Sequence, residues 1–334
     1  MLDPGLIDQM AVEIADAQLR RMPELAQRYG SIGRRRCIED TTFHLRYLDA
    51  AVTLDDATLF GDYIAWAKVM LASRGVGEND LLENLHEIRA ALLSHALADA
   101  AAVVDTTIAT LATMPAAIPS FLTRSSRFSD VSRDYLREVL AGRRLRAEAI
   151  LEQAIAGGAT LQDLYLEIFE PVQHEIGRLW QVNEITIAQE HFCTAAVQRS
   201  ISGLYAKLFV GSAGRRRVVA ACAGRELHEI GLRMVTDLLE LNGWDTVYLG
   251  ANIPIESVVR TVAEAPTALV AISVTITPHL ASARELIDAL RASPRTRDVP
   301  VIAGGYPFRL SNAIAARLGA DAWAVNASDA VIRA

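Results

Sequence analysis

The sequence predicts an α plus α/β protein: an N-terminal helical domain, a four-helix bundle, and a flavodoxin-like (Rossmann-type) five-stranded parallel sheet. In residues 213–334, short apolar runs alternate with amphipathic stretches, as in a parallel sheet with helical crossovers. Upstream, apolar residues recur at helical spacing and strand signals are few. With 334 residues, the chain has room for two or three domains of about 100–200 residues each. We expect domains at 1–124, 125–212 and 213–334.

The first predicted domain is helical throughout. Apolar residues recur at helical spacing in 43–48 and 60–70, and Pro115 and Pro119 stand near its end. The polar stretch 123–130 is the best candidate for a linker.

The second predicted domain is a bundle. Residues 129–210 have a helical pattern that is interrupted at Gly157-Gly158 and near Asn183. Four helices of about 15–20 residues in this range would form a bundle.

The third predicted domain contains five apolar runs that are short enough for strands. A doubly wound sheet of such strands binds ligands at the carboxyl ends of the strands, near the point where the strand order reverses. The runs are 217–223, 245–249, 268–274, 299–303 and 321–325, with helical patterns near 229–241, 255–264, 279–292 and 308–317.

Three groups of polar or small residues follow the first, third and fourth of these runs. Because the carboxyl ends of parallel strands meet at one edge of a sheet, a single ligand there would touch all three groups. The positions are Glu226, His228 and Gly231 after the first run, Ser273 and Thr275 at the third, and Gly304 and Gly305 after the fourth.

This arrangement resembles the cobalamin-binding signature of the methionine synthase type, (Asp)-x-His-x-x-Gly followed by Ser-x-(Leu/Val/Thr) and Gly-Gly. The resemblance implies that His228 ligates the cobalt of cobalamin and displaces its dimethylbenzimidazole tail into the sheet. Gly304 and Gly305 would let the backbone approach the tail, and Ser273 and Thr275 would hydrogen-bond to it. Taken singly, a polar loop histidine and a glycine turn would need no ligand.

Two positions depart from that signature. Glu226 stands where the family has aspartate, so a carboxylate is present to orient the imidazole, but its extra methylene leaves direct contact with His228 open. His279 stands where methionine synthases carry a hydroxyl in the same relay. A place on the surface and a place in the relay are both open for His279.

The predicted bundle has a second pattern, in which nine residues separate Trp180 from Glu190-His191. This resembles the light-sensing cobalamin domains of the carotenoid-gene regulator type. The resemblance implies that adenosylcobalamin binds beneath the bundle, with Trp180 and Ile187 against the adenosyl group and Glu190 and His191 on its ribose or base. The alternative is a core tryptophan and a solvated Glu-His pair.

One position departs from these light sensors as well. Their histidine after the tryptophan, which ligates cobalt once light has expelled the adenosyl group, is Gln181 here. His174 and His191 are the nearest substitutes in the sequence.

The N-terminal domain resembles the helical extension of photocobilins, which pair cobalamin with biliverdin. A bilin needs an apolar slot and cations for two propionates. An ordinary helical core with a charged rim contains the same residue types. Cys37 is a conceivable tether, but we expect non-covalent binding. The candidate bilin residues are His44, Arg46, Tyr47, Tyr63, Trp66 and Lys68.

Composition limits the classes of function. The net charge of −7 argues against a surface that binds nucleic acid, and the arginine triplets 34–36 and 215–217 are short. Three cysteines without metal spacing indicate a reduced, cytoplasmic protein. No apolar run reaches the roughly 18 residues of a membrane span, and no signal-peptide pattern is present.

Together these patterns predict a cytoplasmic photoreceptor rather than an enzyme. Light would break the cobalt–carbon bond of adenosylcobalamin, with biliverdin as a second chromophore. Loss of the adenosyl group would change the domain packing or the oligomeric state, with a dimer in at least one state. One rival is a corrinoid protein that carries methyl groups for methyltransferases, and the other is an adenosylcobalamin sensor that works in the dark. The sequence does not identify a downstream partner.

Overall fold

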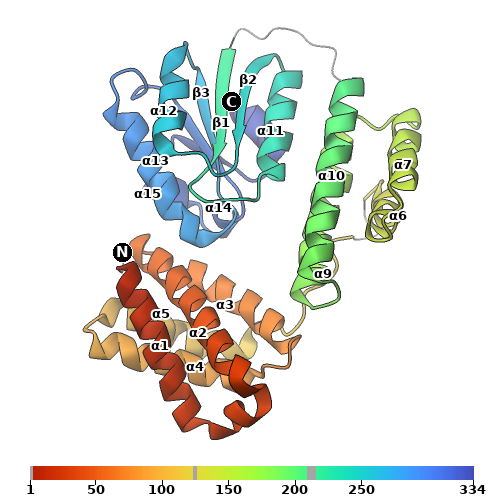
Figure 1. Cartoon of the computed structure of the whole chain (residues 1–334). Coiled ribbons are helices and arrows are strands. Elements are labelled where there is room, and N and C mark those ends of the chain that lie inside the picture. The colour runs from red at the N-terminus through yellow and green to blue at the C-terminus, as the bar shows by residue number, and fades with distance from the viewer. Residues whose placement is uncertain (1–2, 123–125, 209–215) are drawn as a thin grey trace. The chain divides into compact units, whose positions relative to one another are not determined.

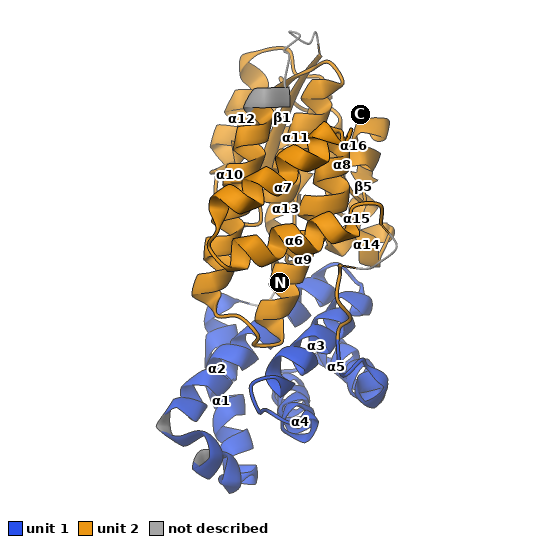
Figure 2. Cartoon of the chain, turned by 90° about the vertical axis from the view of Figure 1, so that its right-hand side faces the viewer, with its two compact units in different colours: residues 1–117 blue, residues 118–334 orange. Residues whose placement is uncertain are grey.

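The structure, a computed structural model, describes residues 3–122, 126–208 and 216–334. The chain divides into two compact units, residues 1–117 and 118–334 (Figure 2). The predicted domain boundaries after residues 124 and 212 fall on or beside residues outside the described ones, so they stay predictions.

The first unit is helical, as the apolar spacing predicts. The long second helix bends at Gly30, whose φ of +61° lies in the left-handed region that glycine adopts most readily. The third begins at Asp56, whose carboxylate accepts a hydrogen bond from the Thr58 backbone N–H and caps the helix. The helices are α1 (Pro4–Arg21), α2 (Pro23–Thr53), α3 (Ala57–Ala72), α4 (Glu78–Ser94), α5 (Ala98–Thr110) and the 3₁₀ turn η1 (Leu111–Thr113).

The second unit opens with the predicted bundle, called the cap below. Two of its breaks lie where the sequence predicts, at Gly158 and Asn183, which have positive φ of 90° and 60°, whereas a third break, at residues 141–143, was not predicted. The cap consists of α6 (Ser129–Leu140), α7 (Arg144–Ala156), a composite helix and α10 (Ile187–Leu208). The composite helix runs through α8 (Leu161–Asp163), the π-helical segment η2 (Leu164–Phe169) and α9 (Glu170–Gln181) (Figure 1).

A proline accompanies the π-helical segment. Pro171 has no N–H to donate, so the carbonyl of Glu167 lacks its usual α-helical partner. The buried Ser132 hydroxyl of α6 donates to that carbonyl instead, at 2.8 Å. A side chain of a neighbouring helix therefore satisfies the backbone group that the proline leaves unpaired.

The remainder of the second unit is a parallel sheet of order β2-β1-β3-β4-β5, with helical crossovers. This confirms the flavodoxin-like prediction, and each strand lies on one of the apolar runs. The strands are apolar almost throughout because helices cover both faces of such a sheet. They are β1 (Arg216–Cys222), β2 (Trp244–Gly250), β3 (Leu269–Ser273), β4 (Val301–Gly304) and β5 (Ala322–Ala324). Around them lie α11 (Ile230–Leu241), α12 (Ile255–Glu264), η3 (Thr277–His279), α13 (Leu280–Ala292), α14 (Pro307–Leu310), α15 (Ala313–Leu318) and α16 (Ala327–Arg333).

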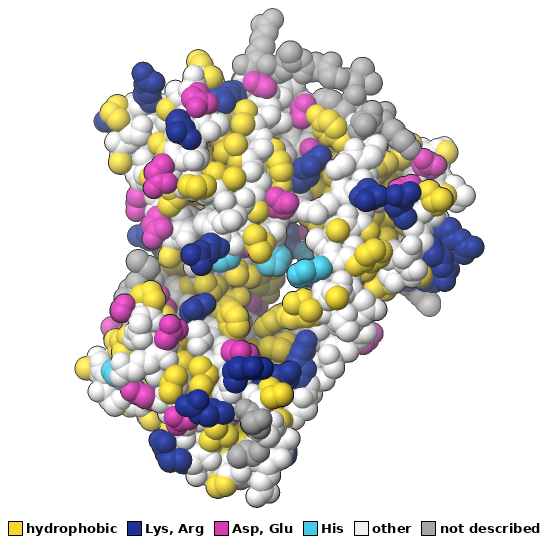
Figure 3. Space-filling model, in the orientation of Figure 1, with side chains coloured by type: hydrophobic (Ala, Val, Ile, Leu, Met, Phe, Trp, Pro, Cys, Tyr) yellow, Lys and Arg dark blue, Asp and Glu magenta, His cyan; other side chains and the backbone are white. Residues whose placement is uncertain are grey.

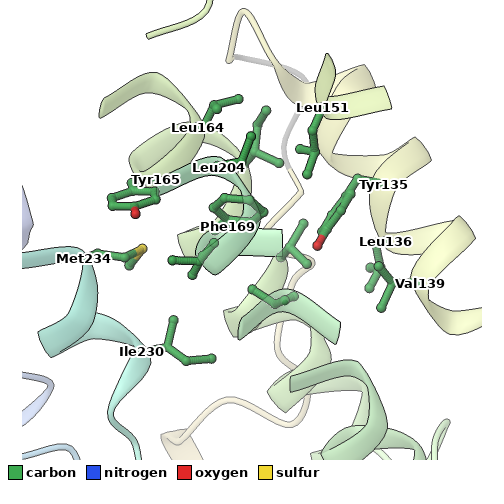
Figure 4. Close-up of a cluster of buried hydrophobic side chains, with 14 of the residues drawn as sticks. Tyr135, Leu136, Val139, Leu151, Leu164, Tyr165, Phe169, Leu204, Ile230 and Met234 are labelled. Atoms are coloured by element: carbon green, nitrogen blue, oxygen red, sulfur yellow. The ribbon is translucent and has the colours of Figure 1, made fainter. Parts of the chain in front are cut away.

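The cap and the sheet share one hydrophobic core. Tyr165 and Phe169 of the π-helical segment belong to the same buried cluster as Ile230 and Met234 of α11 (Figure 4). The Tyr165 hydroxyl also donates to the buried Asp237 carboxylate at 2.6 Å. The two predicted domains therefore pack as one body.

Within the described ranges, none of the helices combines the length and the apolar content that a bilayer span requires.

Candidate functional site

Glu226 holds the ring of His228 in the loop after β1. One carboxylate oxygen, Oε1, lies 2.5 Å from His228 Nδ1 and accepts the backbone N–H groups of Leu227 and His228 at 3.0 and 3.1 Å. Glu226 is 0% exposed. The longer glutamate side chain thus reaches the imidazole directly, the contact that the sequence left open.

The other oxygen, Oε2, ties this loop to the end of β3. It accepts the backbone N–H groups of Thr275 and Ile276 at 2.8 and 3.0 Å, and lies 3.2 Å from His279 Nδ1. His279 therefore belongs to the network rather than to an unrelated surface. Several histidine side chains lie near one another on the face of the molecule in Figure 3.

The electrostatics of this network favour an ionised Glu226 with an N–H on His228 Nδ1. Burial alone would raise the pKa of Glu226, but hydrogen bonds from His228 and His279 outweigh it and hold this pKa far below its usual range. The hydrogen bond with Glu226 raises the pKa of His228 against the opposing effect of burial. With Nδ1 engaged and 61% of its side chain exposed, His228 presents Nε2 to solvent as a metal-binding nitrogen.

The motif glycines do two different things. Gly305 has a φ of +116°, and a Cβ there would lie 1.8 Å from the carbonyl oxygen of Val274, so the fold itself requires glycine. A Cβ on Gly231, in the first turn of α11, would have no neighbouring atom within 4 Å. Gly231 is exposed, so the fold does not itself require glycine at this position.

Ser273, Thr275 and Gly304 lie at the same edge. Ser273 is buried at the end of β3 and pairs in register with Gly304 of β4. A Cβ on Gly304 would lie 3.2 Å from the carbonyl oxygen of Ala324. The three motif groups thus converge at the carboxyl ends of β1, β3 and β4, as the sequence predicts.

The predicted cap residues lie around the start of α10. Glu190 Oε2 is 2.5 Å from His191 Nδ1, and Glu190 Oε1 accepts the Thr194 hydroxyl at 2.9 Å. The His191 side chain and Ile187 are 73% and 59% exposed. The Gln198 side chain of α10 donates to the Glu229 carboxylate at 3.2 Å, so α10 lies beside the loop that carries His228. Trp180 is half-buried and packs against the cap core, as in the alternative of a core tryptophan.

Two family models match the second unit. Residues 216–332 and residues 131–205 each match a model described as a B12 binding domain. This part of the chain belongs to the B12-binding family. The observation confirms cobalamin as the class of cofactor and leaves residues 1–130 outside both matched ranges.

Known relatives of the B12-binding region are corrinoid proteins. Dimethylamine corrinoid protein 2 of Methanosarcina mazei is 27% identical over 163 residues, which cover 48% of this chain and 75% of that protein. Monomethylamine corrinoid protein 1 of Methanosarcina acetivorans is 28% identical over 187 residues, 54% of this chain and 85% of that protein. The solved monomethylamine corrinoid protein of Methanosarcina barkeri shares the fold, with a TM-score of 0.54, 23% identity, and coverage of 62% of this chain and 97% of that one.

Gln181 stands where the light sensors have their second cobalt ligand. Its side chain is buried at 3% exposure at the end of α9. His174, one of the two substitutes, is exposed, and its ring centroid lies 5.2 Å from that of Phe121. His191, the other substitute, is the one that shares α10 with Glu190.

The candidate bilin residues of the first unit are largely engaged in its core. His44 is buried with its Nδ1 2.9 Å from the Tyr63 hydroxyl, and burial lowers the pKa of His44 to about 4, so the ring is neutral. Tyr63 stacks on Tyr47 at 3.7 Å and lies 6.2 Å from Trp66. Lys68 is buried and donates to the carbonyls of residues 111 and 114 at 2.9 and 3.1 Å.

These contacts remove two of the three predicted propionate partners. Neutral His44 supplies no charge, and Lys68 already pairs with Glu78 at 3.0 Å in addition to the two carbonyls. Arg46 is the predicted cation that remains exposed. The cluster has the contacts of an ordinary helical core, the alternative that the sequence left open.

Sequence reasoning missed a polar pocket next to His228. A cavity of about 240 Å³ lies between α10, α11 and β2. The one sequence signal for it is Glu229 and Arg233, four residues apart at the start of the helix after the motif. Its lining residues are Gln198, Ile201, Glu229, Ile230, Arg233 and Tyr248.

Proposed function

We propose that this chain is a corrinoid carrier protein that holds cobalamin at the carboxyl edge of its sheet, with His228 as the lower cobalt ligand, and passes methyl groups between partner methyltransferases. The observation that carries the proposal is the buried Glu226 carboxylate that fixes the exposed His228 ring. Bound cobalamin would supply the cobalt that carries the methyl group. The protein itself binds and orients, and we assign it no catalytic residue.

The residues present fit the cofactor. His228 offers Nε2 on a ring that cannot turn freely, because Glu226 holds Nδ1 and is itself held by the loop after β3. Gly231 leaves open space in the first turn of α11. The named relatives, dimethylamine and monomethylamine corrinoid proteins, support the methyl-carrier role and methyltransferases as the partners.

The test of cofactor binding is the absorption spectrum of protein loaded with cobalamin. We expect the parent to bind with the cofactor's own base displaced. His228→Ala should bind at least about tenfold more weakly with an altered spectrum, since changes to a metal ligand or to the group that orients it have effects of that size. His86→Ala, at an exposed histidine of the first unit, is the matched control. An unchanged affinity and spectrum in His228→Ala would reject His228 as the ligand.

A second function is favoured by the residues at the start of α10. Trp180, Ile187, Glu190 and His191 keep the spacing of the light-sensing cobalamin domains, and Glu190 lies near enough to His228 to affect its pKa. In this alternative the chain binds adenosylcobalamin, and light changes the packing of the cap or the oligomeric state. A half-buried indole and a half-buried carboxylate suit an adenosyl group, since one packs on a base and the other accepts ribose hydroxyls.

Competition between methylcobalamin and adenosylcobalamin separates the two functions. A methyl carrier accepts both forms with similar affinity, whereas a sensor prefers the adenosyl form and loses that preference in Trp180→Ala. Size exclusion with light scattering, in the dark and after green light, tests the sensor further. A preference for the adenosyl form without any change on illumination would indicate a sensor that works in the dark.

A further inference from the structure

The pocket beside His228 has a composition that differs from an apolar cofactor slot. Glu229 accepts the Gln198 side-chain amide at 3.2 Å through Oε1 and the Tyr248 hydroxyl at 3.0 Å through Oε2. Each carboxylate oxygen has a second lone pair, so both can accept another donor. The pocket therefore combines an acceptor, a guanidinium and a carboxamide in about 240 Å³.

The charges of the pocket do not cancel. Arg233 Nε lies 3.5 Å from Asp237 Oδ1, and its guanidinium carbon is 5.7 Å from the Tyr248 ring centroid. The Arg233 charge is thus balanced by Asp237 behind the pocket. Glu229, in the described contacts, is met by the neutral donors Gln198 and Tyr248. A negative group placed against Glu229 would meet a like charge, whereas a neutral N–H donor there would be accepted.

The pocket lies next to the proposed cobalt ligand. Glu229 directly follows His228, so their Cα atoms are about 3.8 Å apart. Gln198 comes from α10, seven residues, or about 10 Å along the helix, beyond His191. The pocket thus joins the loop that carries the proposed cobalt ligand to the cap. The periphery of the corrin ring of cobalamin carries acetamide and propionamide side chains, which are neutral and present both donors and an acceptor.

From this juxtaposition we infer that the pocket of Glu229, Arg233 and Gln198 receives a peripheral primary amide of the corrin and selects amidated corrins over corrins that carry a carboxylate there. Glu229 accepts the amide N–H, and Arg233 donates to the amide carbonyl. The inference rests on the proposed cobalamin binding and adds its selectivity. No covalent step is involved.

The experiment measures the dissociation constants of cobalamin and of the derivatives in which one peripheral amide is hydrolysed to a carboxylate, using the full chain at neutral pH. We expect at least one of these monoacids to bind about tenfold or more weakly than cobalamin, since a buried acceptor loses its donor and meets a like charge. For that monoacid, Glu229→Gln should remove most of the penalty because the amide variant can donate to a carboxylate.

The controls separate selectivity from binding and from folding. Glu285→Gln, at an exposed glutamate of α13, should leave the penalty as in the parent, and thermal unfolding checks that each variant is folded. The inference is overturned if every monoacid binds the parent as tightly as cobalamin does, or if the penalty persists in folded Glu229→Gln. Failure of the parent to bind cobalamin at all would instead reject the proposed function.

Discussion

The Glu226 carboxylate is the residue on which the site depends most. It is fully buried, and it joins two loops that are 49 residues apart in the chain through its bonds to the backbone of Thr275 and to the ring of His228. Buried charges of this kind persist where every lone pair is satisfied, and they destabilise the fold when one partner is removed. We therefore expect the carboxylate to be needed for both cobalamin binding and stability.

Substitution of this carboxylate gives a pH-dependent prediction. The folded-state pKa of Glu226 is depressed, so its contribution to stability is present above its unfolded pKa and is lost as the pH falls. At pH 7 we expect Glu226→Gln to lower the free energy of unfolding by about 3 kcal/mol. Urea denaturation from pH 7 to pH 3 should show the gap between parent and variant shrinking below about pH 5. A gap that stays constant with pH would contradict this.

The two motif glycines give a matched pair. Gly305→Ala should destabilise the protein by more than about 2 kcal/mol, since it combines a positive φ with a clash against the Val274 carbonyl. Gly231→Ala should preserve stability or raise it by up to about 1 kcal/mol, because alanine favours the helix and meets no neighbour. Cobalamin titration completes the comparison.

The same titration decides what the open space at Gly231 is for. We expect Gly231→Ala to bind cobalamin more weakly although it is fully folded, because its new methyl group occupies space beside His228. Equal affinities of the parent and this variant would show that the cofactor does not approach α11.

At the scale of elements, the π-helical segment couples two helices of the cap. Pro171 removes a donor from the composite helix, and Ser132 of α6 replaces it. Tyr165 in the same segment bonds to Asp237 of α11. A π-helical segment in this position links the cap core to the sheet, and such segments are frequent at functional sites.

Removing the Ser132 hydroxyl tests this account. Ser132→Ala should lower the free energy of unfolding by about 0.5–1.5 kcal/mol, since it removes the hydrogen bond to the Glu167 carbonyl. Ser202→Ala, at an exposed serine that bonds within its own helix α10, should change the stability by less than about 0.5 kcal/mol. Similar unfolding curves for the two variants would show that the carbonyl is satisfied in another way.

At the scale of the whole molecule, the chain divides into two units, and both B12-binding ranges lie in the second. Residues 118–334 contain the matched family ranges, the Glu226–His228 contact and the core that the cap and sheet share. Residues 1–117 contain their own core, in which aromatic side chains of α2 and α3 stack on one another.

Deletion of residues 1–117 should therefore leave a folded protein that binds cobalamin with the parent's affinity. The biliverdin prediction is tested in the same pair of proteins. A red-shifted band that co-elutes with the full chain and is absent after the deletion would support a bilin in the first unit. If the full chain takes up no biliverdin, the first unit is better interpreted as a helical bundle for dimerisation or for contact with a partner.

The order of strands and helices was determined by the sequence itself. Strands of a parallel sheet are buried on both faces, so each one appears in the sequence as a continuous apolar run. The helix breaks at Gly158 and Asn183 have a positive φ, which glycine and asparagine adopt more readily than other residues. The placement of His228 after the first run, and of the two glycines after the fourth, follows from that order alone.

Only the tertiary structure decided which side chains meet. That Glu226 reaches His228 and also His279, that Lys68 is engaged by two carbonyls, and that Gln198 closes a pocket over Glu229 each depend on elements far apart in the chain. Periodicity reports which face of an element is buried, but not which residue of another element lies against it. Contacts between distant elements are set by packing and by the need to satisfy buried charges, and these act only once the chain has folded.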